Sequence, residues 1–82
     1  MRRIKNVKEL CESLKRGNTE FRVCLNHGAF SRKTIFLCED GSFSVFNGID
    51  GSISKLSGRQ LRTETIIGRA MRCGAFLAEE DG

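Results

Sequence analysis

The spacing of the apolar residues changes twice along this chain, and the changes limit the folds that are open to it. Near the N-terminus apolar residues recur at three- and four-residue intervals, as one face of a helix requires. In the middle they alternate with polar residues, which is the period of a half-buried strand. The helical spacing returns in the last third. We therefore expect a helix, then strands, then a second helical region.

The first helix is predicted at residues 7–16. Asn6 can cap its N-terminus, and Glu9, three residues later, can complete a capping box. Gly17 is suited to end the helix because glycine tolerates the left-handed conformation found there. The apolar stripe consists of Ile4, Val7, Leu10, Cys11 and Leu14.

Strands are predicted at residues 20–26, 33–38 and 43–46, with a short fourth strand near 53–56. A polar loop is expected between the first two, at residues 27–32. The strands are expected to pair in sequence order as an antiparallel meander.

The link Glu39-Asp40-Gly41 can close the central hairpin in two ways. A two-residue Asp-Gly turn would place Ile35 opposite Phe46. A three-residue loop with Gly41 in a bulge would place Ile35 opposite Val45 and is preferred, because it gathers the apolar residues on one face.

The last helical region begins near Gly58, where Ser57 and Gln60 form a second capping box. The three- and four-residue spacing of its apolar residues is interrupted at residues 62–65 and then resumes. Gly74 is expected to end the helical region. The region is therefore either one irregular helix or two short ones, the second capped by Thr63 or Thr65.

The expected fold class is α+β: an N-terminal helix, a three- or four-stranded antiparallel meander, and C-terminal helical segments packed on one side of the sheet. A chain of 82 residues has room for one core, so residues 1–82 are expected to form a single domain with frayed ends at 1–3 and 79–82. No apolar run reaches the roughly 20 residues that span a bilayer, and no signal peptide is recognisable, which predicts a cytoplasmic protein.

The four cysteines are Cys11, Cys24, Cys38 and Cys73, and no two of them form a CxxC pair. They are expected to be small buried hydrophobic residues, with a Cys24–Cys38 disulfide across neighbouring strands as the alternative. No set of ligands has metal-binding spacing, so neither a metal nor a cofactor is predicted. The single histidine, His27, follows Cys24 by three residues, but no third group is evident to orient it. We therefore expect no enzyme activity.

Two groups of cations are candidates for binding anions or nucleic acid. Arg32 and Lys33 lie in the expected loop after the first strand, together with a glycine and a hydroxyl group. The second group is four arginines of the C-terminal helical region. On one continuous helix they would lie within an arc of about 140° and would form a phosphate-binding face. This group comprises Arg59, Arg62, Arg69 and Arg72. Arginines on the solvent side of an amphipathic helix are the simpler explanation.

The second face of the sheet carries Phe36 and Phe46, with Phe30 in the loop nearby. That is more aromatic surface than a small monomer usually exposes. Either the C-terminal helix covers it, or it is a patch for self-association or for a protein partner.

Several stretches form a pattern that resembles small uncharacterised proteins of bacteria and their prophages, over about residues 20–77. The stretches are LNHGAFSRKTI (25–35), FNGIDGS (46–52), LS (56–57), TIIG (65–68) and GA (74–75). The resemblance implies a bacterial or phage setting, in which a phage-encoded inhibitor of a host system would fit, but no particular chemistry.

With a net charge of +4, the chain is expected to be a small non-enzymatic module that binds a protein, or itself, through an apolar sheet patch with a basic surround. The alternative is an accessory protein that binds nucleic acid through the arginine face.

Overall fold

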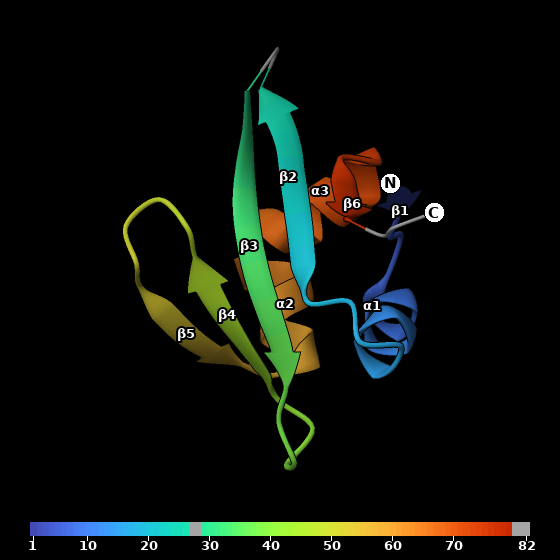
Figure 1. Ribbon diagram of the computed structural model, residues 1–82, viewed down its shortest axis with the longest axis vertical. Helices are drawn as coiled ribbons and strands as arrows, with labels where there is room; N and C mark the ends of the chain where they lie inside the picture. The colour runs from blue at the N-terminus through green and yellow to red at the C-terminus, as the bar shows by residue number, and fades with distance from the viewer. Residues whose placement is uncertain (27–28, 80–82) are drawn as a thin grey trace.

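The computed structural model describes residues 1–26 and 29–79, and within them it shows one antiparallel sheet and three helices (Figure 1). The strand order in the sheet is β1-β6-β2-β3-β4-β5. The strands are β1 (Arg2–Arg3), β2 (Glu20–Asn26), β3 (Ala29–Leu37), β4 (Phe43–Asn47), β5 (Ile53–Leu56) and β6 (Phe76–Ala78). The helices are α1 (Val7–Lys15), α2 (Gly58–Glu64) and α3 (Ile66–Cys73). The predicted α+β class is confirmed.

All three helices lie on one face of the sheet, as predicted, and the core is the apolar layer between them (Figure 1). We call the sheet face toward the helices the inner face and the opposite one the outer face. Phe21 and Phe76 stack on the inner face with their ring centroids 5.2 Å apart. No helix in the described part of the chain is long and apolar enough to cross a membrane.

The first helix begins at the predicted cap, Asn6, but the predicted capping box with Glu9 is not completed. The Asn6 side chain accepts a hydrogen bond from the backbone N–H of Glu9 at 2.9 Å, which satisfies one of the free donors at the helix start. The Glu9 carboxylate reaches back to the N–H of Lys5, one residue before the cap. The helix ends at Lys15, and Gly17 follows with a φ of +93°.

The central hairpin has the predicted register, with Ile35 opposite Val45 and Leu37 opposite Phe43. Gly41 makes this possible because its φ of +86° suits the bulge of a three-residue loop. Its N–H donates to the carbonyl of Cys38 at 3.0 Å. The register fixes which side chains of β3 and β4 face outward.

The predicted loop at residues 27–32 is wrong in part, because β3 begins at Ala29. Ser31 pairs with Val23 and Arg32 with Arg22, and the register shifts between Val23 and Asn26. Backbone pairing with β2 therefore overrides the loop-like composition of this stretch. Residues 27 and 28 lie outside the described residues.

The sheet has two more strands than the four expected from the sequence. Arg2 pairs with Ala78 and Arg3 with Leu77, so β1 occupies an end that is expected to be frayed, and β6 forms from residues to which the sequence assigns no element. β6 also pairs with β2, which places it inside the sheet. Strands of two and three residues are too short to show an alternating pattern. Residues 80–82 lie outside the described residues.

The C-terminal region is two helices rather than one. Thr65 has extended backbone angles, φ −127° and ψ 160°, and serves as C-cap of α2 and N-cap of α3. Its hydroxyl donates to the carbonyl of Leu61 at 2.5 Å and accepts from the N–H of Gly68 at 3.2 Å. Gly74 ends α3 in the left-handed conformation.

The four cysteines are free thiols. Cys11, Cys24 and Cys38 are half-buried, whereas Cys73 is exposed, so the expectation of burial is wrong for Cys73. The alternative of a Cys24–Cys38 disulfide is not realised in this structure.

The junction of α2 and α3 leaves no room for a side chain at Gly68. A Cβ there would overlap the carbonyl oxygen of Arg62 and would lie 2.8 Å from that of Leu61. We expect Gly68→Ala to lower the free energy of unfolding by about 2 kcal/mol or more, measured by urea denaturation, because backbone must move to admit it.

Gly58→Ala is the matched control, since a Cβ at this helical glycine meets Val7 and Phe43 at ordinary distances of 3.5 and 3.7 Å. It should leave the free energy of unfolding unchanged or raise it slightly. Equal losses in both variants would contradict close packing at the junction.

Candidate functional site

The outer face of the sheet is not covered by any described helix, and this is the main candidate site (Figure 1). It carries four exposed apolar side chains that we call the outer patch. They are Phe30, Phe36, Phe46 and Ile53, which expose 48%, 53%, 39% and 70% of their surfaces. The alternative that the C-terminal helix buries these phenylalanines is therefore wrong, because α2 and α3 pack on the inner face.

Strand register brings part of the outer patch together. Phe46 lies between Thr34 on β3 and Ile53 on β5, which are its partners in the two neighbouring strands. Phe36 pairs with Ser44 and so stands diagonal to Phe46, within reach of large side chains. Exposed apolar surface that is contiguous across three strands is typical of an interaction site.

The charges next to the outer patch are of both signs. The Arg22 guanidinium lies over the Phe30 ring, 4.3 Å from its centroid, and forms an ion pair with Glu79. On the same face Glu20 accepts hydrogen bonds from the hydroxyl of Thr34. The surround is therefore mixed in charge rather than uniformly basic.

Arg32 lies directly opposite Arg22 on the outer face. Two like charges in this position repel each other, and Arg22 is compensated by Glu79. Arg32 is exposed and forms no ion pair with the described residues. It is therefore available to a carboxylate of a partner.

Lys33, the neighbour of Arg32, faces the other way. It pairs with Phe21 across β2, so its side chain lies on the inner face, where only 7% of its surface is exposed. The hypothesis that Arg32 and Lys33 act together in one surface site needs correction, because successive residues of a strand point to opposite faces.

The four helical arginines are exposed, but they do not share a continuous helix. Arg59 and Arg62 lie on α2, whereas Arg69 and Arg72 lie on α3, beyond the break at Thr65. The guanidinium of Arg72 donates to the carbonyl of Arg62 at 2.9 Å. The arc expected for one helix is therefore not formed, and these residues lie on the helical side of the molecule, away from the outer patch.

A small polar cluster lies where the β3–β4 loop approaches β5. The Lys55 ammonium is 3.1 Å from the Asp40 carboxylate, and this contact raises the pKa of Lys55. Hydrogen bonds from Ser42 hold the pKa of Asp40 well below its usual range. The Cys38 thiol lies 3.6 Å from the Ser44 hydroxyl, and hydrogen bonding to Ser44 and Ser42 lowers its pKa.

The remaining chemical candidates can be placed only in part. His27 lies outside the described residues, so the suggested Cys24–His27 pair has no described geometry. Among residues 1–26 and 29–79, no three His, Cys, Asp or Glu side chains come together as a metal-binding group.

Sequence reasoning missed two members of the outer face. Ile53 is expected from the sequence only as part of a strand, because the residues between β4 and β5 do not by themselves fix the register that sets it opposite Phe46. Arg22 lies on the outer face because it alternates with Phe21 along β2, and its contacts depend on Phe30 being in a strand and on β6 bringing Glu79 alongside. No local signal indicated either condition.

Comparison with protein-family models, curated proteins and solved structures gave no match for this chain.

The hydrogen bond from Ser44 makes a testable contribution to Cys38. We expect the pH midpoint for alkylation of Cys38 to rise in Ser44→Ala, because the thiolate, which is the reactive form, loses its largest stabilising contact. Iodoacetamide labelling across a pH series, read by mass spectrometry, measures the midpoint. Cys73, an exposed thiol in the same molecule, is the internal standard; an unchanged Cys38 profile would contradict the assigned cause.

Proposed function

We propose that this chain is a non-enzymatic protein-binding module, that the outer patch is its docking surface, and that it docks on the outer patch of a second copy. The observation that carries the proposal is the exposure of Phe30, Phe36, Phe46 and Ile53 on an uncovered sheet face. Contact between this apolar surface and water is unfavourable. Packing against an apolar surface of a second protein removes that contact.

The charges favour a protein over nucleic acid as the partner. A nucleic-acid platform pairs exposed aromatic rings with a surplus of cations that follow the phosphates. Around the outer patch, Arg22 is compensated by Glu79 and Lys55 by Asp40. Arg32 is one uncompensated cation, and Glu20 contributes a negative charge to the same face.

A second copy suits this surface in two respects. Two sheets that each have helices on one face only can pack through their free faces, which gives four layers with the apolar surface inside. A two-fold interface also requires a surface that complements itself, so a cation and a carboxylate must lie on the same face. Arg32 and Glu20 meet that requirement.

The size of the patch sets the expected strength. The exposed parts of Phe36, Phe46 and Ile53, which lie together, amount to a few hundred Å² of apolar surface, on the order of the largest patch of a typical monomer. Stable complexes usually bury about 800 Å² on each partner. We therefore expect a reversible dimer with a Kd in the micromolar range, about 1–100 μM.

Replacing both central rings tests this surface. The double variant Phe36→Ser/Phe46→Ser is expected to sediment as a monomer at concentrations where the unaltered chain is a dimer, in analytical ultracentrifugation over a dilution series. Both side chains are more than one-third exposed, so the free energy of unfolding of the monomer should change little. Ile49→Ser, which alters an exposed apolar residue in the β4–β5 turn, is the control and should dimerise normally.

The proposal is overturned if the unaltered chain remains monomeric up to about 1 mM, or if the double variant dimerises as well as the control. Titration with single-stranded RNA and DNA oligonucleotides completes the test. Salt-sensitive binding of either one that the double variant abolishes would assign the outer patch to nucleic acid instead.

A further inference from the structure

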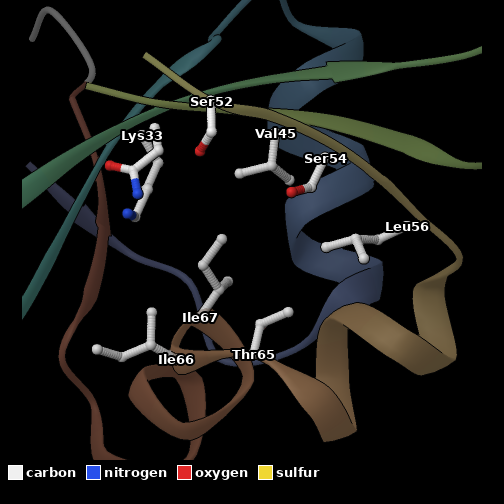
Figure 2. A pocket seen from close by; sticks show the side chains of 9 residues that line it. Lys33, Val45, Ser52, Ser54, Leu56, Thr65, Ile66 and Ile67 are labelled. Atoms are coloured by element: carbon white, nitrogen blue, oxygen red, sulfur yellow. The ribbon is translucent and has the colours of Figure 1, made fainter. Parts of the chain in front are cut away.

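A hollow of about 140 Å³ opens on the inner side of the sheet, between β3, β4 and β5 and the start of α3 (Figure 2). It lies on the face opposite the outer patch and plays no part in the function proposed above. Its polar lining comes from Lys33, Asn47, Ser52, Ser54 and Thr65, and its apolar lining from Val45, Leu56, Ile66 and Ile67. Figure 2 shows Lys33 extending from the sheet toward the space above Ile67.

Lys33 is the unusual member of this lining. Its side chain is 93% buried, since 7% of its surface is exposed, and among the described residues it makes no hydrogen bond or ion pair. The buried part is its aliphatic stem, whereas its ammonium group keeps contact with solvent at the open hollow and has no ion-pair partner in the described part of the chain. A group that supplies the missing negative charge is therefore favoured at this position.

Asp50, in the turn between β4 and β5, is a carboxylate whose pKa is affected by the charge of Lys33. The positive charge of Lys33 contributes to lowering the pKa of Asp50, after the larger effect of hydrogen bonds from Ser52. Asp50 accepts those bonds from the Ser52 N–H at 2.9 Å and from its hydroxyl at 2.7 Å. The Asp50 carboxylate is thus held by Ser52 and forms no ion pair with Lys33.

The start of α3 adds a second source of positive potential. The amide groups of Ile66 and Ile67 are the first of the helix and have no carbonyl partner within it. The helix dipole places partial positive charge at the same end, where anions are stabilised. Thr65, Ile66 and Ile67 line the helical side of the hollow, opposite the strands.

We propose that this hollow is a binding site for a small monocarboxylate with a short apolar body. One lysine matches one negative charge, and the amide groups of α3 and the hydroxyl of Ser54 provide further hydrogen-bond donors. The four aliphatic walls bind the apolar body. A cavity of about 150 Å³ accommodates benzene, so the ligand is of the size of benzoate or isovalerate.

Benzoate and isovalerate are therefore the probes, and their neutral amides, benzamide and isovaleramide, are the controls. In two-dimensional NMR spectra of the ¹⁵N-labelled chain, each carboxylate should shift the backbone amide signals of Ser54, Ile66 and Ile67 saturably, with a Kd of about 1 mM or lower. The amides should bind at least about tenfold more weakly, because they lack the charge that pairs with Lys33. Inorganic phosphate, which has no apolar body, should not saturate these shifts.

Lys33→Met keeps the unbranched apolar stem of the side chain and removes its charged end, and it should weaken carboxylate binding at least about tenfold. Lys55→Met, at an exposed lysine on β5, is the matched control and should bind as the unaltered chain does. The Phe36→Ser/Phe46→Ser variant should also bind normally, which separates this site from the outer patch.

Four results would contradict the proposal, and only one of them needs a variant. One is the absence of saturable shifts with both carboxylates, and another is equal binding of the carboxylates and their amides. The third is undiminished binding in a folded Lys33→Met chain. Phosphate binding as strong as that of benzoate would likewise contradict the role of the apolar walls.

Discussion

The stack of Phe21 on Phe76 joins the C-terminal strand to the first long strand, and the attachment of β6 and β1 to the sheet depends on that contact. Both rings are fully buried, and they hold β6 between β1 and β2. The helices fill the space on the same side of the sheet, so the chain has one apolar layer. A chain of this size has too little apolar material to cover the second face as well.

The alternation of side chains along each strand decides which residues lie on each face of the sheet. Arg32 and Lys33 are adjacent in sequence, and any register that buries Ile35 must also turn Lys33 inward and Arg32 outward. The same strand therefore contributes an uncompensated cation to the outer face and a second cation, with a buried stem, to the hollow beside α3. The two proposed sites are separated by the sheet, so each can be altered without direct contact with the other.

Much of this fold could be predicted because its signals are local. The Asn6 and Ser57 caps mark where helices begin, and Gly41 fixes the central hairpin, so these elements follow from residues a few positions apart. The apolar spacing alone does not predict the break at Thr65, because both a continuous and a divided helix fit it. The Thr65 hydroxyl settles the choice by bonding to Leu61 and Gly68 on either side.

The features that could not be predicted depend on contacts between distant parts of the chain. β1 and β6 are too short to show a period, and the strand character of residues 29–32 depends on pairing with β2. The phenylalanines of the outer patch were named from sequence, but their exposure depends on where the helices pack. The hollow around Lys33 needs three strands and a helix in place before it exists.

The position of β6 also has a consequence for how the protein is made. A strand formed by residues 76–78 lies inside the sheet, next to a strand formed by residues 2–3, so its contacts span nearly the whole described chain. Contacts of such high sequence separation slow folding, because a long loop must close before they form. On the ribosome, β2 to β5 can pair while the chain is still growing, but their β6 edge stays open until Phe76 has emerged. A nascent chain at that stage exposes an unpaired strand edge, which is a site for misassembly with its neighbours.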